Sequence, residues 1–219
     1  MAKVIFSVLL SIAIFGCAQS DSHAQDEKKS NTDQIVGGRC EGCEAIHESK
    51  IPFNALNEID TLSIFNEDGP KLVVSGTVYK SDGKTPAPGV VLYVYQTDQT
   101  GRYRITGNET GWGKRHGSIR GWMKTNAQGQ YKFYTVRPAS YSQTGPPAHI
   151  HVIVKEPDKN EYWIDDFLFD DDPFLTAEER KNHHGLGGNG ILKIKKIDNV
   201  QHAERNIYLG KNIENYPNQ

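Results

Sequence analysis

The chain has few cysteines and methionines, and it has no excess of charge of either sign. Its 219 residues include 3 Cys and 2 Met, and 25 Lys plus Arg stand against 27 Asp plus Glu, for a net charge of −2. Such a balance gives no electrostatic reason to expect binding to nucleic acid or to an anionic membrane surface. We therefore expect a small or neutral partner. Nothing in the sequence excludes a homo-oligomer.

A long apolar run is missing as well. The apolar stretch from Val4 to Phe15 is too short to span a bilayer as a stable helix, so residues 1–16 are interpreted as a signal peptide. The stretch ends at Gly16-Cys17, which resembles a lipobox, where the Cys thiol is acylated and becomes the mature N-terminus. The alternative is an ordinary signal peptide that is cut a few residues later. We expect an exported lipoprotein, periplasmic or at the cell surface, that touches the membrane only through its lipid anchor.

The rest of the chain divides by composition. Residues 17–33 have almost no apolar side chains after the lipidated Cys17, so they cannot bury enough area to offset their conformational entropy and are expected to form a flexible tether. Residues 34–69 have mixed character and are predicted to pack as an N-terminal arm. Residues 70–219 have the size of one compact domain.

Two further cysteines, Cys40 and Cys43, form a CxxC motif in the arm. In an exported chain whose Cys17 is acylated no other thiol competes, which favours a local disulfide. Half of a zinc site, completed by His47, is one alternative. A redox-active dithiol is another, although the thioredoxin-like pattern that usually carries one is missing.

The fold prediction rests on alternating apolar residues. The stretches Leu72–Tyr79 and Gly89–Tyr95 alternate with the period of two that is typical of half-buried strands. Further strands are predicted at Gly121–Thr125, Gln130–Val136, His149–Val154, Trp163–Phe169, Gly190–Lys195 and Asn206–Leu209. Only the window Thr176–Asn182 favours a helix, with Thr176 as its cap. We predict an all-β protein, a β-sandwich of mixed or antiparallel sheets with little helix.

The pair His149 and His151 is the first chemical signal. In a strand these two side chains point to the same face, so both imidazoles can reach one ion from a single rigid element. The apolar run Val152-Ile153-Val154 that follows favours a buried strand. The simpler alternative is a pair of histidines on a wet sheet face.

Three motifs around this pair resemble those of the intradiol ring-cleavage dioxygenases, the family of protocatechuate and catechol dioxygenases. They are Gly101-Arg102-Tyr103, Pro138-Ala139-Ser140-Tyr141 and Pro147-Ala148-His149-Ile150-His151, in that order. The resemblance extends upstream to Ala87-Pro88-Gly89 and downstream to the stretch from Phe169 to Phe174. It covers roughly residues 70 to 175, and the combination is specific where each motif alone is not.

The resemblance implies an Fe(3+) cofactor held by Tyr103, Tyr141, His149 and His151. Anionic phenolate oxygens stabilise ferric iron, and the ferric charge in turn lowers the tyrosine pKa. It further implies an oxidoreductase that cleaves catechol-type aromatic diols with O2 to muconate-type diacids, with Tyr103 and Tyr141 as catalytic residues. Any single tyrosine is more often a packing residue. We assign three others to packing: Tyr79, Tyr93 and Tyr95.

One departure from the family pattern concerns an arginine. The ring-cleaving members carry Arg three residues before the first His of the pair, where this chain has Pro146. Arg137 is our candidate to replace it as a catalytic residue, because it lies four residues before Tyr141; Arg102, Arg104 and Arg120 are alternatives. Two further residues, Asp166 and His116, are either polar groups of the pocket or surface residues.

The departure at Pro146 keeps a second class of function open. A transthyretin-like β-sandwich module could hold catecholates without turning them over. A zinc or manganese site on the same His pair is a third hypothesis. Oxygen consumption in the presence of catechol separates an enzyme from a binding module.

Overall fold

The computed structural model describes residue 1 and residues 35–141 and 145–217. Apart from residue 1, the predicted signal peptide lies outside the described residues, and so do Cys17 and the whole of the predicted tether. Residues 35 onward belong to one compact unit. In the described part of the chain, no helix is both long enough and apolar enough to cross a membrane.

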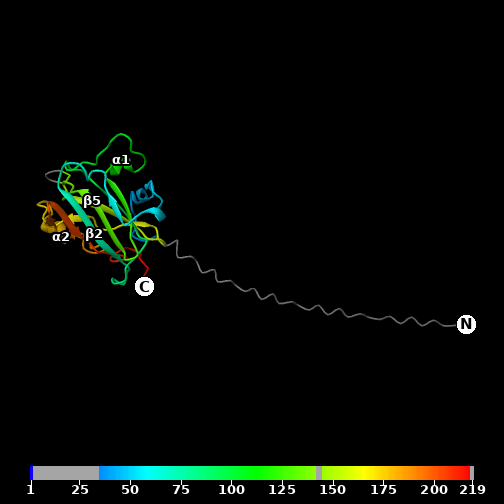
Figure 1. Cartoon of the computed structure of the whole chain (residues 1–219). Helices are drawn as coiled ribbons and strands as arrows, with labels where there is room; N and C mark the ends of the chain where they lie inside the picture. Colours follow the sequence, from blue (N-terminus) through cyan, green and yellow to red (C-terminus); the bar gives the residue numbers. More distant parts are fainter. Residues whose placement is uncertain (2–34, 142–144, 218–219) are drawn as a thin grey trace. The chain divides into compact units, whose positions relative to one another are not determined.

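The first of two mixed sheets is built on β2, which pairs antiparallel with β5 and parallel with β11 and β12. Its strand order is β1-β5-β2-β11-β10. Figure 1 shows β2 and β5 as long neighbouring arrows. The strands of this sheet are β1 (Ile59–Thr61), β2 (Lys71–Tyr79), β5 (Gln130–Val136), β10 (Lys195–Ile197), β11 (Val200–Glu204) and β12 (Ile207–Tyr208).

The second sheet has the order β4-β3-β6-β8-β9, with β7 also paired to β6. Its strands are β3 (Val91–Gln96), β4 (Arg120–Lys124), β6 (His149–Lys155), β7 (Glu161–Trp163), β8 (Phe167–Phe169) and β9 (Ile191–Leu192). Among the described residues, helix is confined to short pieces, namely η2 (Cys43–Glu48), η3 (Phe53–Ala55), α1 (Gly113–His116) and α2 (Ala177–Lys181). The predicted all-β sandwich with little helix is confirmed.

The main core lies between the sheets, because each strand turns every second side chain inward. Phe133 of β5 meets Phe167 of β8 edge to face, with ring centroids 5.8 Å apart. Val152 and Val154 of β6 belong to the same buried cluster. Because Val152 points into this core, His151 and Ile153 must point to the opposite face of the second sheet.

That outer face is covered by the N-terminal arm. Cys43 and Ile46 of η2 form a second buried cluster with Tyr93 of β3 and Ile153 of β6. The cover explains how a sheet can carry large apolar side chains on both faces. It also places the histidines of β6 on a face that is shielded from bulk solvent.

The structure differs from the strand predictions mainly after residue 160. The predicted strand Trp163–Phe169 is two strands, β7 and β8, with a break at Asp165 and Asp166. At the break, the Asp165 carbonyl accepts a hydrogen bond from the buried Arg205 side chain, at 2.6 Å, in place of a strand partner. Strands β1 and β11 were not predicted. Their short, mixed sequences are ordered by pairing with β5 and β2.

Candidate metal centre

Four side-chain atoms from three parts of the chain converge on one point. The Tyr103 hydroxyl lies 2.5 Å from the Tyr141 hydroxyl and 2.8 Å from Nε2 of His151. The Tyr141 hydroxyl lies 3.0 Å from Nε2 of His149 and 3.3 Å from Nε2 of His151. The two Nε2 atoms are 3.2 Å apart. The structure therefore brings together the four residues that the sequence predicts as ligands.

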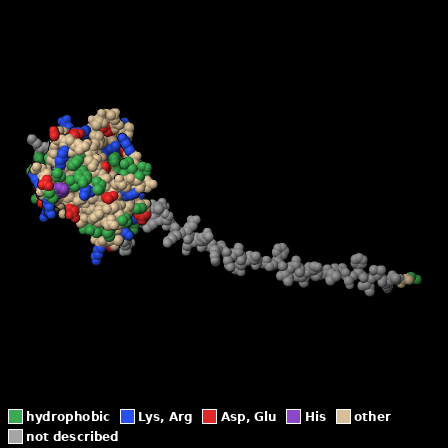
Figure 2. All heavy atoms as spheres, viewed as in Figure 1, with side chains coloured by type: hydrophobic (Ala, Val, Ile, Leu, Met, Phe, Trp, Pro, Cys, Tyr) green, Lys and Arg blue, Asp and Glu red, His purple; other side chains and the backbone are tan. Residues whose placement is uncertain are grey.

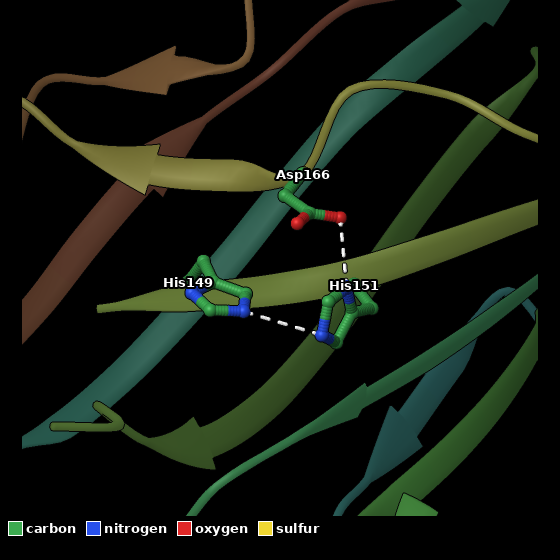
Figure 3. Close-up of side chains that lie close together, drawn as sticks. All are labelled: His149, His151 and Asp166. Atoms are coloured by element: carbon green, nitrogen blue, oxygen red, sulfur yellow. Dashed lines mark hydrogen bonds and ion pairs between the residues drawn. The ribbon is translucent and has the colours of Figure 1, made fainter. Parts of the chain in front are cut away.

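The tautomers of both histidines follow from what their Nδ1 atoms face. Nδ1 of His149 lies 2.7 Å from the Pro147 carbonyl, and Nδ1 of His151 lies 3.0 Å from a carboxylate oxygen of Asp166. Both partners can only accept, so both Nδ1 atoms carry the proton. Each Nε2 of a neutral ring then carries a lone pair, and the two Nε2 atoms face each other, as Figure 3 shows.

A metal ion fits this donor set. The two phenol oxygens and the two Nε2 atoms share only two protons, those of the Tyr103 and Tyr141 hydroxyls. A cation that replaced both protons would interact favourably with all four atoms. Neighbouring donors around a cation with ~2.0–2.1 Å bonds lie ~2.9–3.4 Å apart, close to the separations found here. Two phenolates and two neutral imidazoles suit a ferric ion better than a soft metal.

Burial sets the protonation of these groups in the protein itself. It raises the pKa of Tyr103, and the hydrogen bond to Tyr141 raises it further. It also raises the pKa of Tyr141, and it lowers the pKa of His149, which favours the neutral imidazole. His149 is thus ready to bind a metal, whereas the phenols become phenolates only beside a strong positive charge.

A close backbone approach brings the two tyrosine loops together. Gly101 has φ +73°, and a Cβ added there would lie 2.1 Å from the Ser140 carbonyl oxygen. Asp98 ties both loops: its carboxylate accepts from the Thr100 backbone N–H at 2.8 Å, and its carbonyl accepts from the Ala139 N–H at 3.1 Å. Glycine at position 101 is required here for both its φ and its size.

The start of β6 is held by Asp172, which sequence reasoning missed. This buried carboxylate accepts hydrogen bonds from the backbone N–H groups of Ala148, at 2.9 Å, and Phe174, at 2.8 Å. It therefore fixes the residue just before His149. The only available signal was its place in the motif from Phe169 to Phe174, which carries no indication of a contact with β6.

A hollow of about 510 Å³ is lined by one of the four residues, His151. His151 and Asp166 line one wall, and the arm supplies Cys40 and Glu41 on another. Cys40 and Cys43 are joined in a disulfide with their Cα atoms 5.7 Å apart. A smaller hollow of about 260 Å³, lined by Tyr103 and His116, adjoins Glu41 as well. The arm thus lines both hollows, one of which reaches His151 and the other Tyr103.

Other predicted residues lie in different surroundings. The Arg137 side chain pairs with Asp171 at 2.7 Å and lies over the Phe169 ring, so its contacts lead away from the four donor atoms. His116 is buried, and its burial lowers its pKa to about 4. Its ring stacks on Tyr95, with centroids 3.8 Å apart.

Tyr95 is a packing residue, as predicted, but one of its neighbours is a predicted ligand. Its ring also stacks on His151, with centroids 4.4 Å apart. The cause is the register of the second sheet, in which Tyr95 of β3 lies directly opposite His151 of β6.

The charged side chains on one face of the molecule are mixed in sign. On the face shown in Figure 2, basic and acidic side chains are interspersed and neither sign forms a continuous patch. This agrees with the net charge of −2.

The protein is thus a β-sandwich in which two tyrosines and two histidines are arranged as they would be around a metal ion. A family profile described as Dioxygenase, that of the intradiol dioxygenases, matches residues 53–184, which is more than half of the chain. The chain belongs to this family.

Individual relatives are distant. Catechol 1,2-dioxygenase 1 of Acinetobacter lwoffii is 26% identical over 179 residues, which cover 70% of this chain and 56% of that protein. Intradiol ring-cleavage dioxygenase prcA of Aspergillus niger is 25% identical over 143 residues, covering 58% and 44%. The chain spans about half the length of these curated relatives.

Solved structures share the fold. The dioxygenase domain of a dioxygenase and carbohydrate-binding fusion from Streptomyces sp. SirexAA-E has a TM-score of 0.54 at 21% identity, covering 74% of this chain and 95% of that domain. The 3-chlorocatechol 1,2-dioxygenase of Rhodococcus opacus 1CP has a TM-score of 0.53 at 19% identity, covering 73% and 68%. At such identities the likeness concerns the fold alone.

Proposed function

We propose that the protein is an Fe(III)-dependent intradiol dioxygenase, which cleaves catechol-type rings with O2 to muconate-type diacids. The observation that carries the proposal is the convergence of Tyr103, Tyr141, His149 and His151, with both imidazole lone pairs aimed at one point. Family membership supports it, and two hollows, one lined by His151 and one by Tyr103, reach these residues.

Ferric iron, when bound, would supply the Lewis-acidic, electron-accepting centre at which a deprotonated aromatic diol reacts with O2. The protein's own groups divide the remaining work. His149 and His151 hold their Nε2 atoms in place from a rigid strand, through fixed Nδ1–H donors. Tyr141, which is 37% exposed, is the ligand best placed to accept a proton from an entering diol.

Oxygen uptake tests this function. Purified, iron-loaded protein supplied with catechol should consume one molecule of O2 per catechol, and with isotopically labelled O2 both labelled atoms should appear in a ring-opened diacid. Protein stripped of iron by a chelator is the control and should consume none. A colour change on adding catechol without oxygen uptake would contradict the enzymatic function.

That last outcome would favour a non-catalytic catecholate-binding module. The observation behind this second candidate is Pro146, which stands where ring-cleaving members carry arginine. The side chain of Arg137, our candidate replacement, is held by Asp171. Its action on the substrate stays a prediction that its contacts do not support.

We also propose that the protein is exported and anchored through a lipidated Cys17, because the apolar run that precedes it is too short to span a membrane. Mass spectrometry of the mature N-terminus should find an acylated cysteine at position 17. An unmodified N-terminus downstream of this residue would contradict the anchor.

A further inference from the structure

The two histidines of the centre differ in what holds their Nδ1 atoms. His149 donates to the Pro147 carbonyl, a neutral group two residues earlier on the same segment. His151 donates instead to a carboxylate oxygen of Asp166, which comes from the break between β7 and β8 (Figure 3). One ligand therefore has an ionised partner and the other does not.

The segment that carries Asp166 is itself fixed. The Arg205 side chain, 2% exposed, reaches across the core and donates to the carbonyl of the preceding residue, Asp165, at 2.6 Å. The Asp165 carboxylate accepts from the Leu186 N–H at 2.9 Å. Gly190 packs so closely that an added Cβ would lie 2.4 Å from the Asp166 carbonyl oxygen. A carboxylate on a backbone held from several sides is well suited to orienting a neighbour.

Asp166 has to be distinguished from a direct ligand. His149, His151 and Asp166 each offer one ligand atom, and these atoms lie within 4.8 Å of one another, so a two-histidine, one-carboxylate site is conceivable. However, the Asp166 oxygen is hydrogen-bonded to Nδ1 of His151, on the side of the ring away from the four converging atoms. The places next to the two Nε2 atoms are taken by the hydroxyls of Tyr103 and Tyr141.

We propose that Asp166 is a positioning residue, which fixes the tautomer and orientation of His151 and adds negative charge to this one ligand. The proposal rests on the iron site of the proposed function. A carboxylate behind an imidazole makes the imidazole a stronger electron donor. It therefore stabilises ferric iron more than ferrous iron, because the ferric ion carries the larger charge.

Two substitutions separate orientation from charge. Asp166→Asn retains an oxygen that can accept from Nδ1 of His151 but removes the charge, so iron should still bind, while its reduction potential rises. Asp166→Ala removes both the acceptor and the charge, and iron affinity should fall by ~10- to 100-fold, the usual loss when an outer partner of a ligand is removed. Asp170→Asn is the matched control. This exposed carboxylate, at the end of β8, pairs with Arg180 and should change neither quantity.

Two quantities are measured for the full-length protein and the three variants. One is the iron content after dialysis against increasing concentrations of a chelator, and the other is the reduction potential of the iron, followed by visible absorption. Equal loss of iron in Asp166→Asn and Asp166→Ala would make Asp166 a ligand and overturn the proposal. Wild-type iron content and potential in both variants would overturn it as well. Should Asp166→Ala not fold, the potential of Asp166→Asn decides alone.

Failure of the proposed function is recognised separately. Wild-type protein that takes up no iron would remove the metal site, and the role of Asp166 with it. Wild-type protein that binds iron but consumes no oxygen would remove only the enzymatic activity, because neither measurement on the Asp166 variants depends on turnover.

Discussion

Replacing His149 by alanine should deprive the protein of iron while the sandwich stays folded. His149 is 8% exposed, and its Nε2 lies 3.0 Å from the Tyr141 hydroxyl and 3.2 Å from Nε2 of His151. A rigid strand offers no substitute imidazole, so the loss of affinity should exceed the ~10- to 100-fold that follows removal of an outer partner. Metal analysis after dialysis measures it. Oxygen uptake with catechol should fall in proportion to iron content.

The fold should tolerate this change, because the site lies outside the core between the sheets. His149 donates only to the Pro147 carbonyl in its own segment, so its removal should change the free energy of unfolding of the iron-free protein by no more than ~1–2 kcal/mol. His47→Ala is the matched control, since His47 is an exposed histidine of η2 that pairs with Glu161. Full iron content in His149→Ala would contradict the assignment of this histidine as a ligand.

Sequence reasoning succeeded where the relevant geometry is local. His149 and His151 share a face because strands alternate, which needs only their spacing. The capping box at the start of α2 is equally local, and Thr176 and Glu179 form it as predicted. The sandwich followed from the number of short alternating strands and the turns between them.

The rest depends on contacts between distant segments. Asp166 could not be distinguished from a surface residue, because its contact with His151 depends on a break between β7 and β8. At this break Arg205, which lies between β11 and β12, donates to the Asp165 carbonyl. Likewise, the stacking of Tyr95 on His151 follows from the pairing of β3 with β6. Nothing in residues 34–69 indicated that the disulfide segment would line a hollow together with His151.

The largest spectroscopic effect is expected from the tyrosines. A phenolate bound to ferric iron absorbs in the visible by charge transfer from ligand to metal, so iron-loaded protein should be coloured. Tyr141→Phe removes one phenolate and keeps the ring, and it should weaken and shift the visible band. Oxygen uptake should fall by at least ~100-fold, because the same variant loses the group that accepts the diol proton. Visible spectra measure the change in the band, and oxygen uptake measures the loss of activity, each corrected for iron content.

Tyr103→Phe should also weaken the band, since the Tyr103 hydroxyl lies 2.8 Å from Nε2 of His151. The control must be a tyrosine that does not contact a ligand. Tyr95 is unsuitable because it stacks on His151. Tyr79 is suitable because it lies on β2 of the other sheet and stacks on Tyr208, so Tyr79→Phe should leave the band unchanged. A visible spectrum that survives unaltered in Tyr103→Phe and Tyr141→Phe would mean that neither phenolate binds iron, and a simpler histidine site would then have to replace the dioxygenase centre.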